Sequence, residues 1–122
     1  MTDKPLALII EDDTDLASIF SDALQAAQFR TEIIADGLAA QIRLTETVPQ
    51  LVVLDLHLPR VSGEILLRQI RSTPALARVK VVIASADPIS ADLLSPESDL
   101  VLIKPVSFSQ LRDLAQRLKA TL

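Results

Sequence analysis

Three acidic groups, a hydroxyl and an ammonium group each follow a short apolar run of this sequence. They belong to Glu11 and Asp12, Asp55, Ser85 and Lys104. Brought together, the carboxylates would repel, because like charges about 4 Å apart cost roughly 4 kcal/mol at an effective dielectric of about 20. We therefore expect a cation between them. Oxygen ligands from few protein groups favour Mg²⁺ or Mn²⁺, which keep water ligands and bridge to phosphate oxygens.

The apolar runs predict how these groups meet. They cover residues 6–10, 51–54, 81–84 and 100–103, and each is rich in Val, Ile and Leu. Such runs are typical of strands buried on both faces of a parallel sheet. A more polar run, 30–35, suits a strand at the sheet edge. Ligands bind at the carboxyl ends of parallel strands, so the five polar groups are expected to line one small cleft.

Helical patterns alternate with these strands, which predicts five βα units. The fourth strand is expected over 79–84, and the helix after it should be only about two turns long, between Asp87-Pro88 and Pro96. Ser107 with Gln110 predicts a capping box at the start of the last helix. We expect the apolar stripes to form core, at Leu16, Ile19, Phe20, Ala23, Leu24 and Ala27, at Leu38, Ala39 and Ile42, at Leu66, Leu67 and Ile70, and at Phe108, Leu111, Leu114, Ala115 and Leu118.

Length and composition fit one ordinary domain over residues 1–122. The chain is 49% hydrophobic and carries a net charge of -4, with its 12 Lys and Arg residues scattered. This argues against a basic face for direct nucleic-acid binding. There is no cysteine, and no apolar stretch approaches the roughly 20 residues of a membrane span. We expect no membrane association and a cytoplasmic location.

The chain resembles the receiver domains of two-component response regulators over essentially its whole length. Four motifs carry the likeness, in the family's order: Ile10-Glu11-Asp12, the loop Asp55-Leu56-His57-Leu58-Pro59-Arg60-Val61-Ser62-Gly63, Ser85-Ala86 and Lys104-Pro105. The resemblance implies a flavodoxin-like, doubly wound α/β fold with strand order 2-1-3-4-5 and five helices.

The resemblance also implies a role for each site residue. Asp12 and Asp55 would ligate Mg²⁺ directly, Glu11 would act mainly through bound water, and the backbone carbonyl of His57 would complete the metal ligands. Asp55 would be the nucleophile toward a phosphoryl group. Lys104 would bind a second phosphoryl oxygen, and the Ser85 hydroxyl with the Ala86 N–H would bind the third.

Further family positions bear on lifetime and signalling. His57 and Asp87 stand where receivers control dephosphorylation. Val101 stands where most receivers have Tyr or Phe, and residues 86–99 contain no glycine, unlike the common approach to strand five. Activation by relocation of an aromatic ring is therefore not expected, because a Val side chain cannot sweep a ring between buried and exposed positions.

Two alternatives compete with the role of a phosphoacceptor. A degenerate receiver would act as a phosphorylation-independent binding module, which Val101 favours and the complete acidic pocket disfavours. A phosphatase of the haloacid-dehalogenase type also uses a strand-end Asp, Mg²⁺, a hydroxyl and a Lys. Phosphatases of that type require a second Asp two residues after the nucleophile, where this chain has His57.

The resemblance implies partners as well. The phosphoryl group would come from a sensor histidine kinase or a phosphotransfer protein, and phosphorylation would change the affinity for a downstream protein. We expect a monomer or a weak dimer formed through the fourth helix, fifth strand and fifth helix. The domain is expected to be a stand-alone regulator or a part of a larger protein.

Overall fold

A single five-stranded parallel sheet forms the centre of the molecule. The computed structural model describes residues 3–122. The strands lie in the order β2-β1-β3-β4-β5, which confirms the expected topology. Their bounds are β1 Leu6–Ile10, β2 Arg30–Ile34, β3 Leu51–Leu54, β4 Lys80–Ser85 and β5 Leu100–Ile103. β1 and β3 are neighbours, so the residues that follow these two strands emerge side by side.

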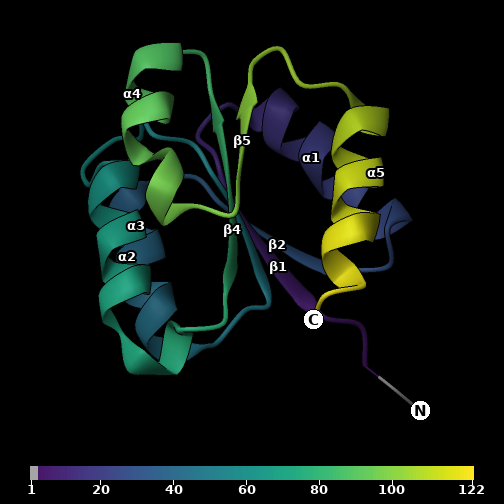
Figure 1. Ribbon diagram of the computed structural model, residues 1–122, viewed down its shortest axis with the longest axis horizontal. Helices are drawn as coiled ribbons and strands as arrows, with labels where there is room; N and C mark the ends of the chain where they lie inside the picture. Colours follow the sequence, from purple (N-terminus) through teal and green to yellow (C-terminus); the bar gives the residue numbers. More distant parts are fainter. Residues whose placement is uncertain (1–2) are drawn as a thin grey trace.

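Helices cover both faces of the sheet (Figure 1). The helices α1 and α5 lie on one face, and α2, α3 and α4 lie on the other. Their bounds are α1 Thr14–Ala26, α2 Gly37–Glu46, α3 Gly63–Ser72, α4 Pro88–Leu94 and α5 Phe108–Lys119, with short 3-10 turns at Pro74–Leu76 and Ser95–Glu97. The predicted short fourth helix is confirmed, because α4 has only 7 residues.

Each of the five helices begins with a side-chain cap. The oxygens of Asp13, Asp36, Ser62, Asp87 and Ser107 accept hydrogen bonds from backbone N–H groups in the first turn. These bonds satisfy donors that a helix cannot pair internally, and each is typically worth about 1 kcal/mol. The caps therefore fix where each helix leaves the carboxyl edge of the sheet.

The core has two parts, one on each side of the sheet. All residues of β1 and β3 are buried, because helices cover both of their faces. Phe20 and Phe29 are the largest side chains of the part beneath α1 and α5, whereas aliphatic residues fill the part beneath α2, α3 and α4. The rigid central strands thus support the loops at their carboxyl ends.

Two details of the predicted helices are wrong. On α2 the buried residues are Gly37, Ala40 and Leu44. The predicted stripe is exposed instead: Leu38 at 36%, Ile42 at 53%, and Ala39 as well. The prediction is wrong because α2 turns Ala40 and Leu44 into the core and places Gly37 against the backbone of Val61. In the other helices, single stripe positions are also exposed: Ile19 lies at 44% and Phe108 at 38%.

The fourth strand is shifted by one residue from its predicted range. It extends to Ser85, whose partner in the sheet is Ile103 and whose carbonyl accepts the Lys104 N–H at 2.8 Å. At its other end, the Val79 carbonyl accepts a hydrogen bond from Arg71 instead of pairing in the sheet. In residues 3–122, no helix combines the length and apolar character needed to cross a bilayer.

Candidate functional site

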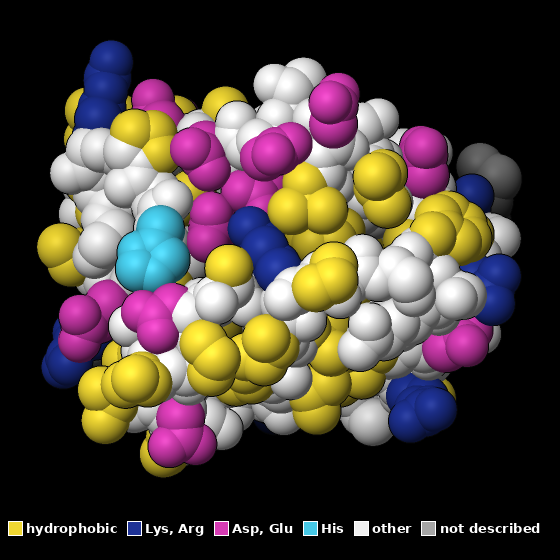
Figure 2. Space-filling model, turned by 90° about the horizontal axis from the view of Figure 1, so that it is seen from above, with side chains coloured by type: hydrophobic (Ala, Val, Ile, Leu, Met, Phe, Trp, Pro, Cys, Tyr) yellow, Lys and Arg dark blue, Asp and Glu magenta, His cyan; other side chains and the backbone are white. Residues whose placement is uncertain are grey.

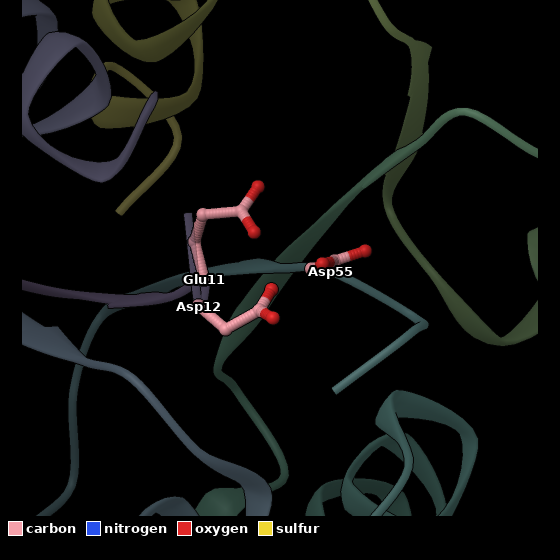
Figure 3. Close-up of side chains that lie close together, drawn as sticks. All are labelled: Glu11, Asp12 and Asp55. Atoms are coloured by element: carbon pink, nitrogen blue, oxygen red, sulfur yellow. The ribbon is translucent and has the colours of Figure 1, made fainter. Parts of the chain in front are cut away.

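Three carboxylates converge at the carboxyl edge of the sheet. Glu11 and Asp12 follow β1, and Asp55 follows β3, and their oxygens lie within 4.8 Å of one another (Figure 3). Glu11 and Asp55 are buried, at 2% and 6% exposure, whereas Asp12 is exposed to solvent. Neighbouring strands deliver these side chains, so the predicted convergence of the acidic residues is found.

Lys104 joins this cluster from the end of β5. Its Nζ lies 2.6 Å from Glu11 Oε1 and 3.7 Å from Asp55 Oδ2. In the space-filling view, several acidic side chains lie along one side of a basic side chain, near the single histidine, and hydrophobic side chains lie on its other side (Figure 2). The cluster contains three carboxylates and one ammonium group, which lies beside two of them. It therefore keeps a net negative charge that suits a divalent cation.

Burial has a marked effect on Glu11. Desolvation raises the pKa of its carboxyl group from 4.5 to about 7, and Asp55 adds to the rise while Lys104 opposes it. The Glu11 Oε2 also accepts the Asp13 N–H at 3.3 Å. The side chain is therefore held in place by contacts on both of its oxygens.

The loop after β3 contributes His57 to the site. The His57 N–H donates to Asp55 Oδ1 at 3.2 Å, which orients the carboxylate. The His57 imidazole is mostly exposed, and its Nε2 lies 3.6 Å from Asp87 Oδ2. This pair connects the loop after β3 to the loop after β4. The Asp87 carboxylate also caps α4, and its hydrogen bond with Ser90 is the main reason why its pKa is lowered.

Ser85 is the last residue of β4, and its backbone carbonyl accepts the N–H of Lys104, the residue that follows β5. Its side chain is fully buried, and its hydroxyl accepts the Asp87 N–H at 3.0 Å. The hydroxyl thus bonds within its own loop in this structure. Ala86 follows in that loop with an exposed side chain. Val101, on β5, is partly buried and packs against the core beneath α2, α3 and α4.

Sequence reasoning missed how the loop after β3 is held. The Pro59 carbonyl accepts the Gly37 N–H at 3.0 Å, and Arg60 has a positive φ of 71°. Asp36-Gly37 signalled only a turn in the sequence. A left-handed arginine has no sequence signal, because such a conformation is uncommon outside glycine.

Fold and site together define a doubly wound α/β domain with a cluster of three carboxylates and one ammonium group at the carboxyl edge of its sheet. Comparison with known proteins narrows the class. Residues 7–116 match the model of the response regulator receiver domain. The chain therefore belongs to the receiver-domain family of two-component signalling systems.

The similar proteins place receiver domains in different contexts. The chain is 34% identical to a probable methanogenesis regulatory protein, FilR2, of Methanothrix harundinacea, over 96% of this chain and 83% of FilR2. It is 30% identical to the sensor histidine kinase TmoS of Ectopseudomonas mendocina, over 91% of this chain but only 12% of TmoS. Whole-protein activities therefore differ among relatives that share this domain.

A solved structure shows the same fold. The receiver domain of a Pseudomonas aeruginosa sensor histidine kinase has a TM-score of 0.85 and 22% identity, over 96% of this chain and 98% of that one. That crystal structure has a magnesium ion coordinated in its active-site cleft.

Proposed function

We propose that this domain receives a phosphoryl group on Asp55 in a Mg²⁺-dependent reaction. The observation that carries the proposal is the cluster itself. One carboxylate oxygen from each of Glu11, Asp12 and Asp55 lies within 4.8 Å of the other two, and the Lys104 ammonium lies beside two of these residues. A phosphatase of the haloacid-dehalogenase type is not supported, since the chain belongs to another family.

The residues present fit a Mg²⁺ ion. The donors are hard oxygens, they lie close together, and Asp12 is open to solvent, so that the ion could keep water ligands. In the proposal Asp12, Asp55 and the His57 carbonyl would hold the ion directly, and Glu11 would hold it through water. Bound there, Mg²⁺ would neutralise charge on one phosphoryl oxygen.

Side chains and backbone groups of the chain itself would make the remaining contacts with the phosphoryl group. An Asp55 carboxylate oxygen forms the new bond to phosphorus as the bond to the donor's leaving group breaks. Lys104 turns from Glu11 toward a second phosphoryl oxygen, and the Ser85 hydroxyl with the Ala86 N–H binds the third. Asp55 and Lys104 directly follow β3 and β5, and Ser85 is the last residue of β4. Their common place at one edge of the sheet supports the proposal, because phosphoryl transfer depends mainly on positioning and on charge neutralisation.

The proposed donor is a sensor histidine kinase or a phosphotransfer protein, and the proposed readout is altered binding of a downstream protein. An exposed apolar face supports a protein-binding role. Ile89 and Leu93 of α4 are 75% and 74% exposed, and Leu100 and Ile103 of β5 are partly exposed. A weak dimer through α4, β5 and α5 would use the same surface.

Acetyl phosphate with and without MgCl₂ tests the proposal. We expect the intact-protein mass to increase by one phosphoryl group only when Mg²⁺ is present, and Asp55→Asn to prevent the increase. A folded protein that stays unlabelled would instead indicate a phosphorylation-independent binding module. Rapid hydrolysis of a panel of phosphorylated metabolites would indicate an enzyme.

A further inference from the structure

The loop that follows Asp55 contains a strained turn. Arg60 has a φ of 71°, and the Pro59 carbonyl accepts the Val61 N–H at 2.9 Å, which closes a three-residue turn. Turns of this kind are rare and unfavourable for residues other than glycine. Such a conformation persists only where the surroundings hold it in place.

Contacts with the N-terminus of α2 keep the turn in this conformation. The Gly37 N–H donates to the same Pro59 carbonyl at 3.0 Å. A methyl group on Gly37 would lie 1.7 Å from the Val61 carbonyl oxygen and 2.6 Å from its carbonyl carbon. Both atoms belong to the backbone, so no side-chain rotation could relieve the clash. The Asp36 carboxylate, which caps α2, also lies 3.8 Å from Arg60 Nε.

A displacement of the Pro59–Val61 turn away from Gly37 would also move the backbone next to Asp55. The far end of the loop is fixed, because the Gly63 N–H donates to the Leu56 carbonyl at 3.0 Å, and Gly63 packs against the Asp55 backbone. The part that can yield is therefore residues 57–61. That part includes the His57 carbonyl, a proposed metal ligand, and the His57 N–H that orients Asp55.

We propose that Gly37 is a positioning residue for metal binding at Asp55. By seating the Pro59–Val61 turn on the N-terminus of α2, it keeps the His57 backbone in the orientation that the metal requires. This inference rests on the proposed function, because it assumes that Mg²⁺ binds at the cluster. In the proposal, Gly37 itself would contact neither the metal nor the phosphoryl group.

The test is a Gly37→Ala variant with Ala39→Gly as its matched control. Ala39 is exposed in the first turn of the same helix, so its replacement weakens α2 without touching the loop. The chain has no Trp or Tyr, so MgCl₂ binding is measured by titration calorimetry. We expect Gly37→Ala to weaken Mg²⁺ binding about tenfold or more, and Ala39→Gly to stay within about twofold of the parent.

Equal Mg²⁺ affinities for Gly37→Ala and the parent would overturn this inference and leave the proposed function standing. Equal losses in both variants, in step with their melting temperatures, would also overturn it, since that result indicates only a structural role. A parent protein that binds no Mg²⁺ would overturn both proposals.

A measurement on the unmodified chain decides the matter if Gly37→Ala does not fold. If the loop and α2 act as one unit, saturating MgCl₂ should slow hydrogen exchange at the Gly37 amide, which bonds to the loop. The Ala39 amide bonds to Asp36 within its own turn and should change little. An unchanged Gly37 exchange rate in a protein that binds Mg²⁺ would contradict the inference.

Discussion

The metal-free protein is expected to lose stability as Glu11 ionises. Burial raises the pKa of Glu11 from 4.5 to about 7 in the folded chain, so between these values the folded state holds a proton that the unfolded state has released. Stability must then fall as pH rises across this window. The change corresponds to roughly 3 kcal/mol at about 1.4 kcal/mol per tenfold change in the equilibrium constant.

Urea unfolding without divalent cations, followed by circular dichroism from about pH 4 to about pH 8, measures this effect. Many other groups titrate in the same range, so the test is the difference between the parent and Glu11→Gln. The amide cannot ionise and should remove this part of the pH dependence. The two stability curves should therefore diverge between pH 4.5 and 7, with the parent losing more.

Curves that run parallel over that window would refute the reasoning, because they would mean that Lys104 holds Glu11 ionised throughout. A parent that gains stability relative to Glu11→Gln as pH rises would refute it more strongly. With Mg²⁺ added, protons and metal should compete, and the apparent Mg²⁺ affinity should rise with pH up to about 7.

Three other predictions concern the metal, the lifetime of the phosphorylated form and the response to it. Mg²⁺ at about a hundredfold excess over its Kd should stabilise the fold by ~2.7 kcal/mol, and Asp12→Ala should lose most of the corresponding rise in melting temperature; equal melting temperatures with and without Mg²⁺ would contradict this. A His57→Ala, Asp87→Ala double variant should change the rate of dephosphorylation more than the rate of phosphoryl uptake, since in the proposed reaction both side chains would flank the path of the attacking water; unchanged decay of the phosphorylated form would argue against it. Beryllofluoride should alter hydrogen exchange most in residues 86–100, because a two-turn helix depends on tertiary support; changes confined to the loop around Asp55 would point to another readout.

Much of the fold could be predicted because the central strands are buried on both faces. Apolar runs with polar residues at their ends predicted where β1, β3 and β5 lie, and parallel geometry then predicted that Glu11, Asp12 and Asp55 meet. Helix faces were less predictable. Leu38 and Ile42 have helical spacing, but α2 packs through Gly37 and Ala40, and only contacts distant in sequence determine that choice.

The details of the site depended on side-chain orientation, which spacing does not encode. The sequence predicted that Lys104 lies in the cleft, but not that its Nζ lies 2.6 Å from Glu11. The contact between His57 and Asp87 likewise joins the loops that follow the neighbouring strands β3 and β4, and it depends on how each loop turns its side chain. The contact of Gly37 with the Pro59–Val61 turn could not be predicted either, because it also joins residues that are distant in sequence.

The most direct test of the central claim is to find which residue carries the phosphoryl group. After reaction with acetyl phosphate and Mg²⁺, the product should be acid-stable and base-labile, and borohydride reduction followed by peptide mass spectrometry should locate the modification at Asp55 alone. Asp55→Asn should carry none. Phosphate found on His57 or Ser85, or undiminished labelling of Asp55→Asn, would contradict the account.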